Sequence, residues 1–194
     1  MKYFLISLCG LALLLTVFLP SCSNNEEEIA NKSIRTEIKL SESTRTAADN
    51  LQDFYLKFTT DLVSTVDINI TDYSKNVVVS PLSASMVFGL LANGTDDISK
   101  EAILKYLGIS DINALNPLSQ TMLKELPVAD NLTNVALANS IWADNTLILS
   151  KNYSSAMEKF YNLESHSYDI SHSDKLLADV NNWCSNHTNG LIKN

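Results

Sequence analysis

The sequence predicts an α+β fold in which helices outnumber strands. Apolar residues recur at helical spacing through most of the chain after residue 49, whereas residues 133–142 alternate with period two, as in a strand. No pattern repeats at a fixed period, which argues against a solenoid. The expected order of elements is helix, strand, three helices, strand, helix, strand, helix.

The first expected helix begins near Asp49 and carries one apolar face, made of Leu51, Phe54, Tyr55, Phe58, Leu62 and Val66. A polar turn region follows, and the β-branched run 77–79 predicts a short buried strand. Ser80 is a suitable N-cap and Pro81 a suitable first helical residue, so the next helix is expected to cover 82–91. This segment is apolar nearly all round, which predicts a buried helix.

Two helices are expected next. Ser99 would cap residues 100–107, and Gly108 would stop that helix. A second apolar pattern predicts a helix from residue 112 to 126, which Pro117 either starts or kinks. The alternation over 133–142 then predicts a long strand that is covered on both faces.

The remaining segment predicts one more helix, a strand and a last helix. The first of these helices is marked by Tyr153, Met157, Phe160 and Tyr161, and residues 166–170 form the expected strand. The last helix has an inward-facing apolar stripe of Leu176, Leu177, Val180, Trp183 and Cys184.

The N-terminus has the features of a secretory signal peptide over residues 1–21. Lys2 provides a positive charge, and an apolar run extends to Leu19. The end of this run, Leu-Pro-Ser-Cys22, resembles a bacterial lipobox, in which the cysteine is acylated and becomes the first residue of the mature chain. We therefore expect a lipid such as palmitate on Cys22 and a membrane-anchored, extracytoplasmic lipoprotein, periplasmic or at the cell surface. Simple secretion and an uncleaved anchor remain as alternatives.

Residues 22–48 are polar and contain few apolar side chains, so we expect a flexible tether between the lipid and a domain over residues 49–194. The acidic run 26–28 resembles a surface-export signal of some bacterial lipoproteins, or is an ordinary solvated charge run. Once the signal peptide with Cys9 is removed and Cys22 is acylated, Cys184 is the remaining thiol. No internal disulfide is then expected.

The charge balance excludes some partners. With 14 Lys and Arg against 22 Asp and Glu, the net charge of −8 argues against nucleic-acid binding, which needs a basic face. No zincin, nucleophile-elbow, Walker or dinucleotide-binding motif is present. We expect no enzyme activity, no cofactor and no metal.

Three clusters contain residue types that catalytic or metal sites use. His166 and His172, with Asp169 and Asp174, could hold a metal, but their spacing fits neither a helix face nor a tight chelating loop, so a solvated junction is favoured. Cys184 and His187 lie three residues apart, yet Cys184 falls on the apolar stripe. The serines at positions 80, 83 and 85 have no base attached, so capping and buried hydrogen bonding are the favoured interpretation.

Five blocks, in order and at the right spacing, resemble the serpins, the serine protease inhibitor family. They are NVVVSPLS (76–83), FGLLANGT (88–95), EAILKYLG (101–108), NVALANSIWAD (134–144), and VNNW with TNGLI (180–183 and 188–192). Leu191 is one departure, because the family usually has Lys there.

The resemblance implies a multi-sheet serpin fold with surrounding helices, and inhibition of a serine, or possibly a cysteine, endopeptidase by a bait loop that inserts into the central sheet. It also implies that Ser80, Ser83 and Asn181 belong to the shutter, a hydrogen-bond cluster that governs opening of this sheet. We expect the chain to stop after the helix that crosses the central sheet. It would then lack the reactive-centre loop, would not inhibit as given, and would offer no reactive-site residue to name. A non-inhibitory extracytoplasmic binding module or a gene fragment is the alternative.

Overall fold

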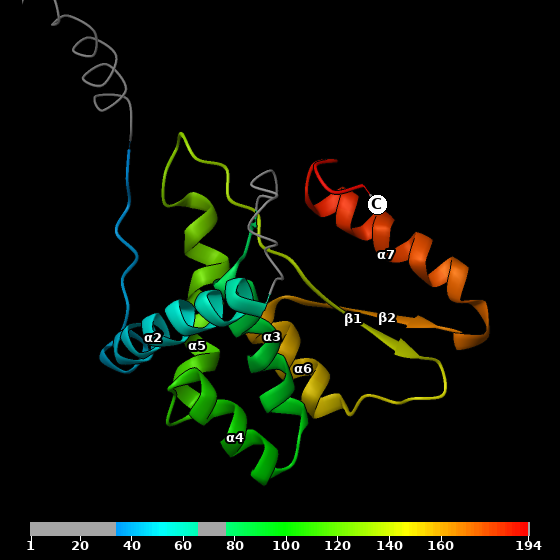
Figure 1. Ribbon diagram of the computed structural model, residues 1–194, viewed down its shortest axis with the longest axis horizontal. Coiled ribbons are helices and arrows are strands. Elements are labelled where there is room, and N and C mark those ends of the chain that lie inside the picture. Colours follow the sequence, from blue (N-terminus) through cyan, green and yellow to red (C-terminus); the bar gives the residue numbers. More distant parts are fainter. Residues whose placement is uncertain (1–33, 66–76, 194) are drawn as a thin grey trace, which may run out of the picture. The chain divides into compact units, whose positions relative to one another are not determined.

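The computed structural model describes residues 34–65 and 77–193 (Figure 1). The chain divides into two compact units, residues 1–35 and residues 36–194. The expected signal peptide, Cys22 and the first part of the expected tether lie outside the described residues. The helices and strands discussed below all belong to the second unit.

The second unit contains helices and a small sheet, which confirms the α+β prediction (Figure 1). The α-helices are α2 (Glu42–Thr65), α3 (Pro81–Gly94), α4 (Asp97–Leu107), α5 (Ile112–Glu125), α6 (Lys151–Tyr161) and α7 (Ser173–His187). The strands are β1 (Asn139–Asp144) and β2 (Leu163–Tyr168), and two short 3₁₀ turns cover Leu126–Val128 and Ile170–His172.

Helix α2 begins at Glu42, seven residues before residue 49, so the predicted tether is helical over 42–48. The Oγ of Ser41 accepts a hydrogen bond from the backbone N–H of Thr44, which satisfies one of the free donors at the start of the helix. Thr44 and Ala47 are buried. The spacing of large apolar residues does not predict a helix over 42–48, because the side chains that are buried there, Thr44 and Ala47, are small.

The helix ends agree with most of the predicted signals. Ser80 caps α3, and Gly108 ends α4 in the left-handed region with φ 71°. The cap of α4 is Asp96 instead of Ser99, because the carboxylate of Asp96 accepts from the Ser99 N–H. Pro117 lies inside α5, which Asp111 caps, so this proline does not start the helix.

The two strands pair in parallel, and α6 connects them. Asn139 lies opposite Leu163, and the register runs without a break to Asp144 opposite Tyr168. A parallel pair needs such a crossover connection. β1 is shorter than the strand predicted over 133–142, and β2 begins before the predicted residue 166.

Three predictions of burial were wrong for the described residues. Residues 77–79 form no strand, and Val78 is 94% exposed, because no described strand lies beside it to complete a hydrogen-bonded ladder. Helix α3 packs against both core clusters but is uncovered on one side, where Val87 and Leu91 are 52% and 53% exposed. Likewise, α7 has no buried residue, and Leu177 of its predicted inward stripe is 61% exposed.

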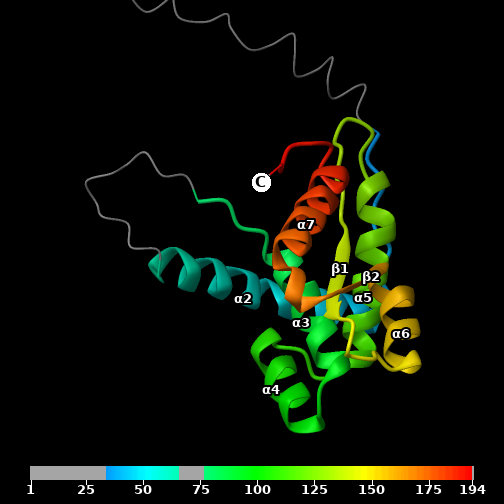
Figure 2. The ribbon, with the colours of Figure 1, turned by 90° about the vertical axis from the view of Figure 1, so that its right-hand side faces the viewer.

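The core consists of two apolar clusters. The larger lies between α2, α3, α4 and α5, where the ring of Phe54 meets those of Phe88 and Tyr106 edge-on. The smaller contains Met86, Met157, Tyr161 and Leu163, and it joins α3 to α6 and β2. Helix α7 lies next to the two strands (Figure 2). None of the described helices has the length and apolarity needed to span a bilayer.

Candidate functional site

The start of α3 holds two of the three predicted shutter residues. The Oγ of Ser80 accepts from the Ser83 N–H at 3.3 Å, and the two hydroxyl oxygens lie 2.8 Å apart. One turn on, the buried Ser85 donates to the carbonyl of Leu82 and lies 3.4 Å from the hydroxyl of Tyr55. These contacts confirm that Ser80 caps the helix and that Ser85 is buried and hydrogen-bonded, whereas Ser80 and Ser83 are exposed.

Asn181, the third predicted shutter residue, is half-buried on α7. Within the described residues, no hydrogen bond joins Asn181 to Ser80 or Ser83. The structure therefore brings the two serines together and leaves Asn181 outside their hydrogen bonds. The shutter role of all three residues stays a prediction.

One face of the sheet carries a polar and aromatic cluster that the sequence did not reveal. Glu164 and His166 are two residues apart on β2, so their side chains share a face. The Trp142 ring, from β1, stacks on the His166 ring with centroids 4.2 Å apart. From α7, Trp183 Nε1 donates to Glu164 Oε2 at 2.8 Å, and His187 Nε2 lies 3.0 Å from Glu164 Oε1.

Glu164 is the centre of this cluster. Hydrogen bonding from Trp183, together with the nearby His187 and His166, holds the pKa of the Glu164 carboxyl below its ordinary value. Spacing could have indicated the cluster, because Glu164 and His166 are i, i+2 on a strand while Trp183 and His187 are i, i+4 on a helix. The sequence could not show that these two pairs face each other.

The structure separates the histidines that the sequence grouped as a weak metal candidate. His172 Nδ1 lies 3.1 Å from Asp169 Oδ2 at the exposed start of α7, whereas His166 stacks on Trp142. Hydrogen bonds from Ser171 hold the pKa of Asp169 below its ordinary value. The part of the chain that the structure describes contains no group of three His, Cys, Asp or Glu placed to hold a metal ion.

Cys184 and His187 do not form a thiol–imidazole pair in the structure. His187 Nδ1 lies 2.9 Å from the carbonyl oxygen of Trp183, and its Nε2 faces Glu164. Cys184 is half-buried, and its carbonyl accepts from Thr188. Because both ring nitrogens of His187 are engaged elsewhere, this histidine is not placed to act as a base for the thiol.

A second polar group lies inside the helical core. The amides of Asn93 and Asn116 bond reciprocally, each Nδ2 donating to the other's Oδ1 at 2.9 and 3.0 Å. The hydroxyl of the fully buried Tyr161 donates to Asn116 Oδ1 at 2.8 Å. Burial raises the pKa of Tyr161 to about 12. These bonds tie α3, α5 and α6 together and satisfy polar atoms that burial would otherwise penalise.

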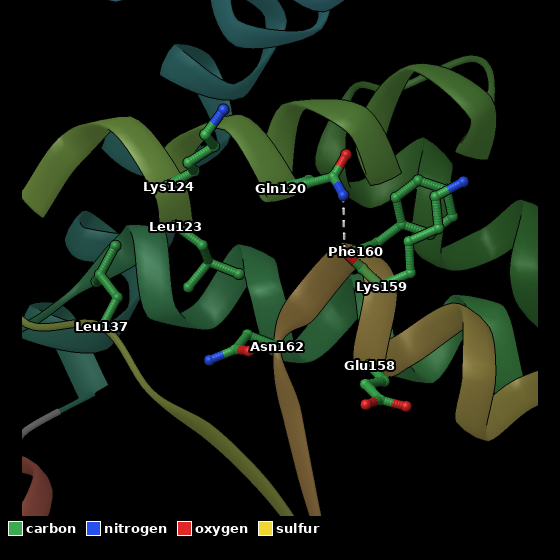
Figure 3. Close-up of a pocket in the computed structure, with 8 residues that line it drawn as sticks. All are labelled: Gln120, Leu123, Lys124, Leu137, Glu158, Lys159, Phe160 and Asn162. Atoms are coloured by element: carbon green, nitrogen blue, oxygen red, sulfur yellow. Dashed lines mark hydrogen bonds between the residues drawn. The ribbon is translucent and has the colours of Figure 1, made fainter.

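A pocket of about 310 Å³ lies between α5 and α6 (Figure 3). Beside the pocket, Gln120 Nε2 on α5 donates a hydrogen bond to the backbone carbonyl of Lys159 on α6. The lining residues are Gln120, Leu123, Lys124, Leu137, Glu158, Lys159, Phe160 and Asn162. This lining contains no Ser, Cys or His, and its ionisable side chains are Lys124, Glu158 and Lys159.

The arrangement of the helices around the parallel β1–α6–β2 unit matches solved structures of one protein family. The family model "Serpin (serine protease inhibitor)" matches residues 53–194, so the chain belongs to the serpin family. The resemblance read from the sequence is thereby confirmed.

Individual relatives agree with this assignment. Serpin-ZX of Arabidopsis thaliana is 30% identical over 130 residues, which are 64% of this chain and 33% of that protein. Among solved structures, Arabidopsis AtSerpin1 in its native stressed conformation has a TM-score of 0.66 at 25% identity, covering 80% of this chain and 39% of that one. The thermophilic serpin tengpin, in its latent state, has a TM-score of 0.62 at 27% identity, covering 81% and 40%. The chain thus spans about a third of the length of the curated relatives it matches.

Proposed function

We propose that this chain supplies the framework of a serpin that inhibits a serine-type, or alternatively a cysteine-type, endopeptidase, and that it is not itself an enzyme. The observation that carries this proposal is the family match over residues 53–194. The β1–α6–β2 unit with α7 next to it supports the same function, because inhibition by this family depends on a sheet that accepts the bait loop.

Two experiments test the inhibitor proposal: the nucleotide sequence downstream of codon 194 is determined, and complex formation with proteases is then measured. We expect the nucleotides that follow codon 194 to encode, in one of the frames, a hinge rich in Gly, Ala and Thr followed by strands. The chain joined to that sequence should form SDS-stable complexes with a serine or cysteine protease, and the 194-residue chain should form none. Absence of such a downstream sequence, or of any stable complex, would contradict the intact-inhibitor version and favour a non-inhibitory binding module.

The shutter proposal concerns Ser80, Ser83 and Asn181. The 2.8 Å contact between the hydroxyls of Ser80 and Ser83 supports it, because a hydroxyl can exchange one hydrogen-bond partner for another when strands separate. In the joined protein, Asn181→Ala should change the rate of spontaneous loss of inhibitory activity at raised temperature. The exposed neighbour Asn182, changed to Ala, is the control. Equal rates in the two variants would argue against the proposal.

We also propose that Cys22 carries a lipid that anchors the protein outside the cytoplasm. The lipobox-like end of the apolar run at the N-terminus supports this proposal. The expressed protein should enter the detergent phase of Triton X-114 and incorporate labelled palmitate. Cys22→Ser should abolish both behaviours, whereas Cys184→Ser, which leaves the lipobox intact, should not. Retention of the label by Cys22→Ser would refute the anchor.

A further inference from the structure

We propose that Glu164, His166 and His187 form a pH-responsive clasp, which holds α7 on the β1–β2 sheet more tightly as the medium is acidified through the histidine range. The proposal rests on the contacts of these three side chains and is independent of the proposed inhibitory function.

The first argument is the donor count at His187. Its Nδ1 lies 2.9 Å from the carbonyl oxygen of Trp183, and its Nε2 lies 3.0 Å from Glu164 Oε1. Both partners are acceptors. A neutral imidazole has one N–H and one lone pair, so it can satisfy only one of these contacts, whereas an imidazolium donates to both. The docked position of α7 therefore gives each N–H of an imidazolium at position 187 its own acceptor.

The second argument is the position of His166 on the other side of the same carboxylate. Its Nε2 lies 3.5 Å from Glu164 Oε2 and is buried without a hydrogen-bond partner. A proton on this nitrogen would place a positive charge beside the carboxylate and against the face of the Trp142 ring, which also attracts a cation. Protonation of either histidine thus acts in the same direction.

The carboxylate must stay ionised for the clasp to close. Trp183 Nε1 donates to Glu164 Oε2 and favours the charged form, as does the proximity of the two histidines. The clasp therefore needs protonated imidazole rings beside an ionised carboxylate, and the lowered pKa of Glu164 keeps that carboxylate charged further into acid. Linkage requires that a state which binds the extra proton is favoured as the pH falls.

Other charged groups on the adjoining elements pair elsewhere. On α7, Lys175 lies 2.6 Å from Asp179. On β1, Asp144 accepts from Thr146 and from the backbone of Ile170. Within the described ranges, the charged groups that act on Glu164 are His187 and His166, and none comes from α6 or β1. These two histidines are therefore the source of the expected pH dependence.

The test measures the rate of amide hydrogen exchange in α7 and compares it with the rate in α5 of the same full chain. The buffer contains a metal chelator. After correction for intrinsic exchange rates, we expect protection of residues 173–187, relative to 112–125, to rise about five-fold from about pH 7.5 to about pH 5.5. His187→Gln, and separately Glu164→Gln, should reduce this rise below about two-fold. His172→Gln is the matched control and should keep it, because His172 contacts Asp169 and not Glu164.

A second readout uses the two tryptophans of the chain, Trp142 and Trp183, each of which stacks on a histidine ring. Imidazolium quenches indole fluorescence, so acidification should quench the wild-type emission, with part of the amplitude lost in His187→Gln and none lost in His172→Gln. An unchanged exchange ratio in the wild type, an unchanged rise in His187→Gln, or a loss of the rise in His172→Gln would each overturn the clasp. If α7 exchanges too fast to measure, an absent fluorescence transition overturns it instead.

Discussion

Replacement of Gly89 by alanine should destabilise the protein, because the α3 backbone passes directly over the Tyr161 ring. A Cβ at position 89 would lie 2.2 Å from the Tyr161 hydroxyl oxygen and 2.9 Å from Cζ, far inside van der Waals contact. Tyr161 is fully buried, so its ring cannot move aside into solvent. Relief requires displacement of the ring and loss of the hydrogen bond to Asn116.

The size of the effect follows from three contributions. Overpacking in a core costs about 1–3 kcal/mol. Loss of the Tyr161 hydrogen bond adds about 1 kcal/mol. The higher helix propensity of alanine, relative to glycine, stabilises the folded state by about 1 kcal/mol. We therefore expect the free energy of unfolding to fall by roughly 2 kcal/mol in Gly89→Ala.

The assay is urea unfolding of the full chain, followed by far-ultraviolet circular dichroism. Gly94→Ala is the matched control, because its Cβ would meet only the Tyr153 ring edge at 3.0 Å, and that half-buried ring can shift. Tyr161→Phe should cost about 1 kcal/mol alone. The double variant with Gly89→Ala should lose less than the sum, because the oxygen that clashes is gone. A Gly89→Ala loss below about 0.5 kcal/mol, or strict additivity, would refute the reasoning.

Three further predictions concern single side chains. Tyr161 should ionise only in strong alkali. With its pKa raised from 10.0 to about 12, its stabilising contribution is complete below pH 10 and is lost as the pH rises toward 12, which ultraviolet titration beside unfolding curves would detect. Gly108→Ala should cost about 1–2 kcal/mol, because residue 108 has φ 71°; an unchanged urea midpoint would contradict this. Leu107→Ala should cost about 3 kcal/mol, because Leu107 is fully buried, whereas Ile98→Ala, at a position 84% exposed, should change stability by less than about 0.5 kcal/mol; equal losses would contradict the packing argument.

The local features of the fold were predictable because they depend on neighbouring residues. Ser80 caps α3, Gly108 ends α4, and the helical spacing through α2, α4 and α5 corresponds to the larger core cluster. These signals are set by hydrogen bonds and faces within a few residues of one another.

The features that failed depend on partners distant in the sequence. The spacing of apolar residues shows which face of a helix or strand is apolar, but it does not show which other segment packs against that face. Val78 and Leu177 are exposed among the described residues although their pattern predicted burial. The Glu164 cluster was missed for the same reason, since β2 and α7 each contribute an ordinary pair of polar and aromatic residues. The predicted roles of Cys22 and of the shutter residues stay predictions.

The paired amides of Asn93 and Asn116 have a consequence for how the helices can slide. Each amide both donates to and accepts from the other, so the two bonds form only when α3 and α5 are aligned residue for residue. A slip of one residue would move one helix by about 1.5 Å along its axis and break both bonds at once, leaving Asn93 Oδ1 and Asn116 Nδ2 without the partners they have here. Leucine–methionine contacts would tolerate the same slip at little penalty. The amide pair therefore fixes the register of α3 against α5. It selects one alignment among several that the apolar side chains alone would accept.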